Sequence, residues 1–245
     1  MKIVKTASRS ETGLVRKTNQ DSVLCLSEVN VFAVADGMGG GSEGELASSM
    51  VCEGLARSVR ASAYMRRIGE IAEAVSAANA RIFEYAKERG FRQMGSTVAL
   101  LAVDDTGFER GVVGYIGDSR VYRVRCGTAE LLTRDHSVGA ELDLAVAGSG
   151  GRFSARSNPL AHILTRAIGT KEEVQLEWRK VDIAEGDRFV ICSDGVHDVV
   201  ETDALSGLVS RGALEKAADA LEREVVSRGA PDNYSFVIAE IGGAR

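Results

Sequence analysis

The sequence predicts an α+β fold in which antiparallel sheets are covered by helices. Short stretches rich in Val and Ile recur along the chain, and Gly, Asp, Asn or Ser residues bound them, as is typical of strands. These stretches come in runs joined by brief turns and do not alternate strictly with helices. This order favours antiparallel layers with helices outside them over a doubly wound parallel sheet.

Nine strands and three helices are expected from these patterns. The expected strands are 2–8, 22–26, 31–35, 97–103, 110–116, 121–125, 173–181, 188–192 and 235–241. Helices are expected at 43–60, 66–89 and 213–228, where apolar residues recur at helical spacing. In the second helix Ile71, Val75 and Ile82 share one face, and Gly90 follows as a C-cap.

The regular pattern is interrupted between Ser137 and Leu164. This segment contains Gly148-Ser149-Gly150-Gly151 and ends in a polar stretch with Asn158-Pro159. A long irregular segment inside a compact domain is either a functional flap or disorder. We expect one domain over residues 1–245, with a flap at about 137–164, because chains of up to about 250 residues usually form a single core.

The composition excludes several classes of protein. Apolar residues make up 44% and charged residues 27% of the chain, which is typical of globular proteins. The net charge of −5 argues against a nucleic-acid partner, because such proteins carry a basic excess. The longest apolar run, 98–103, is far shorter than the ~20 residues of a membrane helix. The four cysteines are widely spaced, so we expect a cytoplasmic protein with reduced thiols and no membrane segment.

Aspartates follow the apolar strands at several points. Asp36, Asp118 and Asp194 each end such a strand beside glycine, Asp232 precedes the last strand, and Asp21 precedes the second. One Asp-Gly pair is an ordinary turn signal, but several at strand ends favour converging carboxylates. Converging carboxylates repel one another unless a divalent cation lies among them. Oxygen ligands without histidine or thiolate favour Mg²⁺ or Mn²⁺ over Zn²⁺.

Nine short motifs occur in the order found in bacterial metal-dependent protein phosphatases of the protein phosphatase 2C family. They are Arg16-Lys17-Thr18-Asn19-Gln20-Asp21, Ala35-Asp36-Gly37-Met38-Gly39-Gly40, Gly44-Glu45, Met94-Gly95-Ser96-Thr97, Gly117-Asp118-Ser119-Arg120, Leu132-Thr133-Arg134-Asp135-His136-Ser137, Leu164-Thr165-Arg166-Ala167-Ile168-Gly169, Cys192-Ser193-Asp194-Gly195 and Asp232-Asn233. The chain resembles this family over nearly its whole length. The resemblance implies a four-layer αββα sandwich, with two central antiparallel sheets flanked by helices and metals at one end.

The resemblance also implies a role for each matching residue. Asp36 corresponds to the carboxylate that bridges two Mn²⁺ or Mg²⁺ ions, and the Gly37 carbonyl is a further ligand. Asp194 and Asp232 correspond to the ligands that complete the second metal site, and Asp118 with Asp194 to a weaker third site. Two further matches concern the substrates of the reaction: Asp21 corresponds to an acidic residue that orients water, and Arg16 to the arginine that binds the substrate phosphate.

The implied activity is hydrolysis of phosphoserine and phosphothreonine in proteins by a metal-activated water. The implied partners are phosphorylated proteins and a bacterial Ser/Thr kinase that the enzyme opposes, and a monomer is the expected state. Two alternatives stay open. One is a phosphatase of an anti-sigma-factor antagonist, which ranks second because such enzymes carry attached domains. The other is a catalytically weak module that binds phosphoproteins.

Two departures from the family pattern bear on these alternatives. Relatives carry histidine directly after the Asp-Gly-Met-Gly-Gly motif, at the position of Gly41 here, so a histidine acid at that position is missing. We expect structural roles for the three histidines of the chain, His136, His162 and His197. The second departure is the flap, which reads Asn158-Pro159-Leu160-Ala161-His162 and lacks the arginine that relatives carry there.

Overall fold

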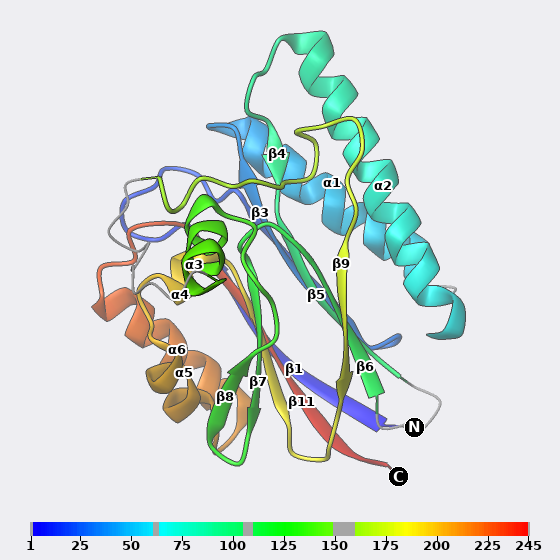
Figure 1. Cartoon of the computed structure of the whole chain (residues 1–245). Coiled ribbons are helices and arrows are strands. Elements are labelled where there is room, and N and C mark those ends of the chain that lie inside the picture. Colours follow the sequence, from blue (N-terminus) through cyan, green and yellow to red (C-terminus); the bar gives the residue numbers. More distant parts are fainter. Residues whose placement is uncertain (1, 61–63, 105–109, 149–159, 245) are drawn as a thin grey trace.

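The computed structural model describes residues 2–60, 64–104, 110–148 and 160–244 (Figure 1). Its strands form two sheets in which all strand pairs are antiparallel. One sheet has the strand order β1-β11-β10-β7-β8, and the other has the order β2-β3-β5-β6-β9, with β4 paired to β3. Helices cover the outer face of each sheet, which confirms the α+β class and the four-layer sandwich.

The strands agree closely with the ranges expected from the sequence. Those of the first sheet are β1 (Lys2–Glu11), β7 (Arg120–Arg125), β8 (Thr128–Leu131), β10 (Arg188–Cys192) and β11 (Tyr234–Ala244). Those of the second sheet are β2 (Asp21–Leu26), β3 (Val31–Met38), β4 (Gly95–Ser96), β5 (Val98–Val103), β6 (Arg110–Ile116) and β9 (Glu177–Asp182). Neither β8 nor β4 is predicted by the sequence, because β8 is a four-residue strand without buried residues and β4 has two residues.

Three helices match the predicted ones, and three were missed. The matches are α1 (Ser42–Val59), α2 (Tyr64–Arg89) and α6 (Leu214–Ser227). The others are α3 (Val138–Gly148), α4 (Asp194–His197) and α5 (Thr202–Val209). The expectation of an irregular flap is wrong for α3, whose run of mostly apolar residues has no polar face to reveal a helical period. The rest of the flap glycines and Asn158-Pro159 lie outside the described residues.

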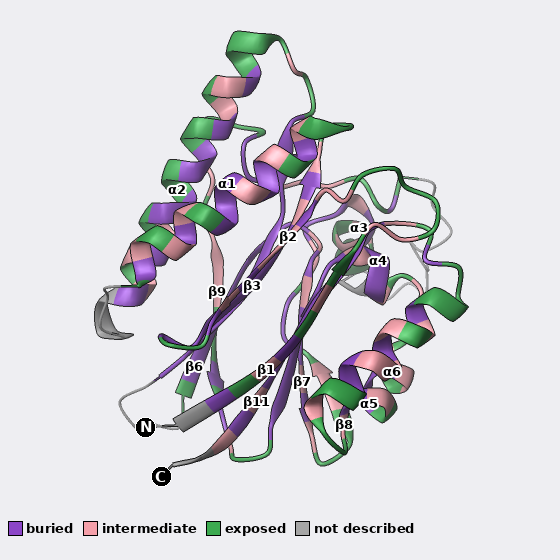
Figure 2. Cartoon of the chain, turned by 180° about the vertical axis from the view of Figure 1, so that it is seen from behind, coloured by how far each residue is buried: buried purple, intermediate pink, exposed green. Residues whose placement is uncertain are grey.

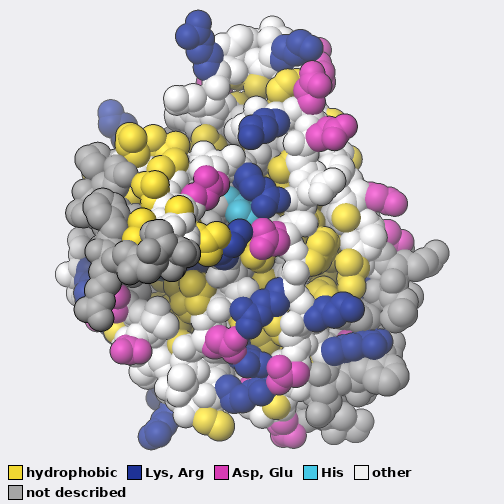
Figure 3. Space-filling view, viewed as in Figure 1, with side chains coloured by type: hydrophobic (Ala, Val, Ile, Leu, Met, Phe, Trp, Pro, Cys, Tyr) yellow, Lys and Arg dark blue, Asp and Glu magenta, His cyan; other side chains and the backbone are white. Residues whose placement is uncertain are grey.

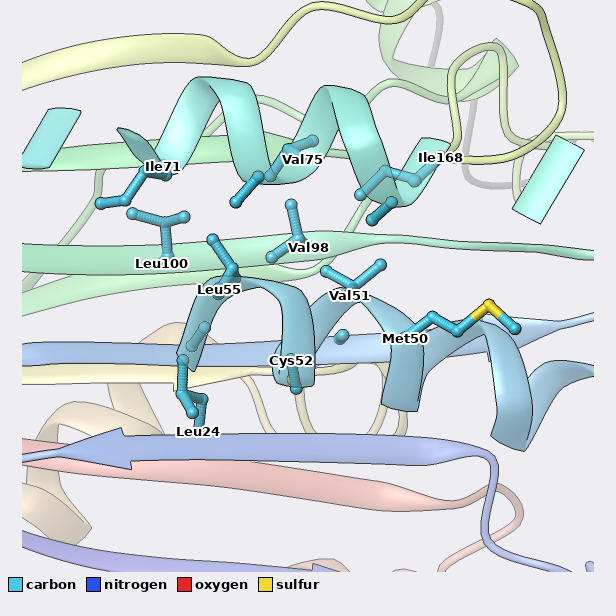
Figure 4. Close-up of a cluster of buried hydrophobic side chains, with 14 of the residues drawn as sticks. Leu24, Met50, Val51, Cys52, Leu55, Ile71, Val75, Val98, Leu100 and Ile168 are labelled. Carbon is cyan, nitrogen blue, oxygen red and sulfur yellow. The ribbon is translucent and has the colours of Figure 1, made fainter. Parts of the chain in front are cut away.

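Buried side chains fill three layers between these elements. The layer between the two sheets contains Phe32, Val34, Phe189, Ile191 and Val237. A second layer lies between α1, α2 and the β2–β9 sheet, where Leu55, Ile71 and Leu100 pack together (Figure 4). The third layer lies under α5 and α6. Figure 2 shows that the helices expose their outer faces while the central strands are buried. This rigid scaffold holds the strand ends that carry the predicted site.

Candidate active site

The topology brings the predicted aspartates to one end of the sandwich. Asp21 opens β2 and lies opposite Asp36 of β3 in the antiparallel register. Because β3 and β6 are both antiparallel to β5, they point the same way, so the turn after β6 places Asp118 at the same end as Asp36. In the other sheet, Asp194 follows β10 and Asp232 precedes its antiparallel neighbour β11, so these two residues also share an end.

Glycines at this end let the backbone segments approach very closely. A Cβ added to Gly37 would lie 2.0 Å from the carbonyl oxygen of Gly44, at the start of α1. A Cβ added to Gly195 would lie 2.0 Å from the carbonyl oxygen of Asn233. No side chain fits at either position, so glycine is required where the chain passes Asp36 and Asp194.

Asn233 fastens the loop between β1 and β2 to the site. Its Oδ1 accepts a hydrogen bond from the backbone N–H of Gln20 at 2.9 Å. Its Nδ2 donates to the carbonyl oxygens of Thr12 and Thr18, both at 2.8 Å. This side chain therefore satisfies backbone groups on both sides of Arg16 and fixes that residue beside Asp232. In the sequence, Asn233 is apparent only as part of the Asp232-Asn233 motif.

Arg16 and Asp232 form an ion pair in the described structure. The Nη2 of Arg16 lies 2.6 Å from Oδ2 of Asp232. The pKa of Arg16 is raised chiefly by this hydrogen bond, and the charges of Asp194 and Asp36 raise it further. The residue predicted to bind phosphate is thus a counter-charge for the predicted metal ligands.

The acidic side chains raise one another's pKa. For Asp36 the pKa lies well above its usual range, because of burial first and then of the charges of Asp194, Asp21 and Asp118. Burial and the charge of Asp194 likewise raise the pKa of Asp118 to about 7. The pKa of Asp194 is also raised, by burial, although His197 lowers it in part. These four aspartates form what we call the carboxylate cluster: Asp21, Asp36, Asp118 and Asp194.

Asp21 is the most enclosed member of the carboxylate cluster. Burial raises its pKa to about 7, against the hydrogen bond from Ser193 that lowers it. That bond joins the Ser193 hydroxyl to Oδ2 of Asp21 at 2.7 Å. The other oxygen, Oδ1, is buried and has no hydrogen-bond partner in the structure. An unsatisfied carboxylate oxygen beside other acids indicates a place for a water or a cation.

The donor set of the cluster fits hard divalent cations. All its side-chain ligands are carboxylate oxygens, which suit Mg²⁺ and Mn²⁺. Within residues 2–60, 64–104, 110–148 and 160–244, no three His, Cys, Asp or Glu side chains already form a metal-holding group. Oδ2 of Asp232 is paired with Arg16, so Arg16 competes with a metal ion for this oxygen.

Two histidines lie near the cluster without belonging to it. His197 of α4 places Nε2 at 3.0 Å from the carbonyl oxygen of Asp118. His136 is buried, and its Nδ1 accepts the backbone N–H of Gly117 at 3.1 Å. Both contacts hold the backbone at Asp118, as structural histidines do.

The third histidine and Gly41 lie in other surroundings. His162 is exposed and lies 3.7 Å from Asp198. Gly41 has a φ of 61°, which an L side chain adopts only with strain.

His136 belongs to a second group of charged side chains, which we call the Glu177 network: Tyr115, His136, Arg166 and Glu177. Glu177 accepts hydrogen bonds from the Tyr115 hydroxyl at 2.8 Å and from Arg166 at 3.2 Å. His136 Nε2 lies 3.0 Å from Glu177 Oε2. Because Nδ1 of His136 is an acceptor, the proton of the neutral ring lies on Nε2 and is donated to Glu177. These bonds give Arg166 a structural role in the Glu177 network.

Cys192, which lies close to the site in sequence, is a buried structural residue and not a reactive one. Cys192 ends β10 two residues before Asp194 and is fully buried. Burial raises the pKa of its thiol to about 12, so the reactive thiolate is suppressed near neutral pH.

The chain is similar in sequence to known proteins of one family. A sequence profile described as Protein phosphatase 2C matches residues 14–228. The serine/threonine protein phosphatase PstP of Mycobacterium tuberculosis is 32% identical over 243 residues, which cover 98% of this chain but 45% of PstP. The chain thus spans about half of that relative.

Solved structures extend the likeness to the fold. A structure of PppA, described as a key regulatory component of T6SS in Pseudomonas aeruginosa, has a TM-score of 0.87 at 32% identity and covers 97% of each chain. The catalytic domain of PstP in complex with two manganese ions has a TM-score of 0.86 at 29% identity, covering 99% of this chain and all of that domain.

Proposed function

The chain belongs to the protein phosphatase 2C family of metal-dependent serine/threonine phosphatases, and from this membership we propose that its carboxylate cluster is a phosphatase reaction centre. The proposed reaction is the hydrolysis of phosphoserine and phosphothreonine in proteins. The observation that carries it is the set of four aspartates that lie together beside Arg16 and whose pKa values are raised by burial and by neighbouring acids. Such uncompensated charge suits a site that binds divalent cations and a phosphate group.

The metal ligands in this proposal are five residues at the end of the sandwich. Asp36 would be a ligand shared by two Mn²⁺ or Mg²⁺ ions, with the carbonyl oxygen of Gly37 as a further ligand. Asp194 and Asp232 would hold the second ion, and Asp118 with Asp194 a weaker third ion. Support comes from the shared location of these residues and from the two manganese ions in the related PstP domain.

The remaining groups of the chain position the reactants. When bound, the divalent ions supply Lewis acidity that activates a water molecule and offsets phosphate charge. Asp21 offers its unpartnered Oδ1 as the acceptor that orients the attacking water. Arg16, released from Asp232, places its planar guanidinium against two phosphate oxygens. Because Gly41 replaces the histidine of relatives, the proton for the departing alkoxide comes from water near Asp21.

The setting of this activity is also part of the proposal. Residues 1–245 form one catalytic domain, which acts as a monomer in the cytoplasm on phosphorylated proteins. There it opposes a Ser/Thr kinase and so takes part in signal transduction. No helix within the described ranges is long and apolar enough to cross a membrane.

Hydrolysis of a phosphothreonine peptide tests the proposal. We expect turnover with added Mn²⁺, none with EDTA, and none in the Asp36→Asn variant. Asp182→Asn is the matched control, since Asp182 is an exposed aspartate paired with Arg123 and Arg125 and lies far along the sheet from the site. A folded, Mn²⁺-loaded protein without turnover would instead support the phosphoprotein-binding module.

A further inference from the structure

A cavity of about 830 Å³ opens beside Asp118. Its walls come from the end of β8, the first turns of α3, the segment after α4, and the chain that follows residue 160. Charged and polar side chains make up most of the wall, and apolar side chains lie among them: Leu131, Ala140, Leu144, Ala161 and Val199. A cavity of this size that combines apolar surface with convergent polar groups is typical of a binding site.

Exposed apolar side chains concentrate around this cavity. Seven large hydrophobic residues are exposed in the described part of the chain. Leu131 and Leu144 line the cavity, and Leu144 has 57% of its surface exposed. Leu160 and Ile163 flank two lining residues, and Leu14 and Val15 directly precede Arg16. Six of the seven thus lie at the catalytic end, and Figure 3 shows hydrophobic side chains gathered at the upper left of this face.

Several charged side chains of the cavity wall already have partners. Arg120 forms a two-pronged ion pair with Asp135, with distances of 2.9 and 2.6 Å. Asp198 has His162 within 3.7 Å. These charges are matched inside the protein, whereas Leu131 and Leu144 of the same wall are still exposed and can bury apolar surface against a ligand.

The cavity is continuous with the proposed reaction centre. Asp118 is both a member of the carboxylate cluster and part of the cavity wall. A polypeptide that places its phosphate between Arg16 and the metal ligands has this cavity directly beside its phosphorylated residue. This continuity selects the occupant: the residues that flank the phosphorylated one.

We propose that this cavity receives an apolar side chain of the phosphoprotein substrate, close in sequence to the phosphorylated residue. Leu131 and Leu144 contact that side chain and determine the preference for it. The inference rests on the proposed phosphatase function and adds a substrate class to it: phosphoserine or phosphothreonine with an apolar neighbour.

Matched phosphothreonine peptides test this inference. Two peptides are compared that differ in having leucine or serine at the positions nearest to the phosphothreonine. We expect the leucine peptide to have a kcat/KM roughly 10-fold higher, through a lower KM. In Leu144→Ser this ratio falls toward one. Val226→Ser is the control and keeps the ratio, because Val226 is an exposed apolar residue of α6 outside the cavity wall.

p-Nitrophenyl phosphate separates this inference from the proposed function, because it has no flanking residues. If it is hydrolysed but the two peptides react alike in the wild type, the inference is wrong while the function stands. Equal ratios in the wild type and in a Leu131→Ser, Leu144→Ser double variant also contradict it. If p-nitrophenyl phosphate is not hydrolysed at all, the function fails and the inference with it. Melting curves show that each variant is folded.

Discussion

The carboxylate cluster and the Glu177 network are neighbouring groups of charged side chains with opposite electrostatics. In the cluster, Asp21 and Asp36 face each other across a strand pair, and burial with mutual repulsion raises their pKa values. In the network, Glu177 receives three hydrogen bonds, and the bond from His136 lowers its pKa. The carboxylate cluster lacks positive charge to balance its acids, whereas Glu177 in the network already has its hydrogen-bond donors.

This difference indicates that the carboxylate cluster can bind cations, whereas the Glu177 network supports the structure around it. An acid that keeps a raised pKa in the folded protein gains free energy when a cation arrives. A carboxylate that already has its donors gains nothing more and serves to fix its neighbours. Here the network fixes the backbone of Gly117 through His136, and so holds Asp118 in place for the cluster. The predictions below separate these two roles.

The largest effect is expected for Asp36, the most repelled acid of the cluster. Asp36→Asn removes the bridging charge, so activity on a phosphothreonine peptide should fall roughly 10³-fold. Stability in the absence of metal should not fall, because a repulsive charge is lost. Steady-state kinetics and thermal melting measure the two quantities. Retained activity in a folded Asp36→Asn variant would show that Asp36 is not an essential metal ligand.

Replacement of Arg16 should weaken the enzyme's action on its substrate without weakening metal binding. In Arg16→Ala we expect kcat/KM to fall roughly 100-fold, because the phosphate loses a charged two-pronged contact. Mn²⁺ affinity should stay the same or rise, since Asp232 is freed from its ion pair. Arg9→Ala is the control, because Arg9 also pairs with acids, on α6, away from the site. A parallel loss of Mn²⁺ binding in Arg16→Ala contradicts the phosphate role.

Replacement of a residue in the Glu177 network should lower the stability of the fold more than it lowers activity. His136→Ala removes one of the three donors to Glu177 and leaves the Gly117 N–H without its acceptor, which costs about 1–3 kcal/mol of unfolding free energy. The melting temperature should fall by several degrees. Activity should fall much less than in Asp36→Asn, and mainly through weaker binding of the third metal near Asp118. An unchanged melting temperature would show that the network does not support the fold.

The smallest effect is a pH dependence of the metal-free protein. Asp21 and Asp118 have pKa values of about 7 in the fold, against about 4 in an unfolded chain. Between these values the native state binds more protons, so the free energy of unfolding should fall as pH rises from about 4 to 7. Denaturant titrations with EDTA measure this slope, and Asp21→Asn should reduce it. A rising stability over the same range contradicts the raised pKa values.

The sequence predicts the parts of the site that follow from strand ends. Asp36, Asp118 and Asp194 are each next to an apolar strand, and antiparallel pairing then carries them to one end. Asn233 and Glu177 could not be found in this way. Asn233 bonds to carbonyl oxygens more than 200 residues earlier, and Glu177 meets His136 across 41 residues. Such contacts depend on tertiary packing, which no local pattern encodes. The helix α3 was missed because its residues lack an alternation between apolar and polar faces.

The most direct test of the central claim is a calorimetric titration of Mn²⁺ into the metal-free protein and into Asp36→Asn. We expect at least two ions to bind to the wild type, with proton release from the cluster and a higher melting temperature. The variant should lose the tight binding while Asp182→Asn keeps it. If the wild type and Asp36→Asn bind Mn²⁺ equally, the carboxylate cluster does not hold the metal ions, and the account is wrong.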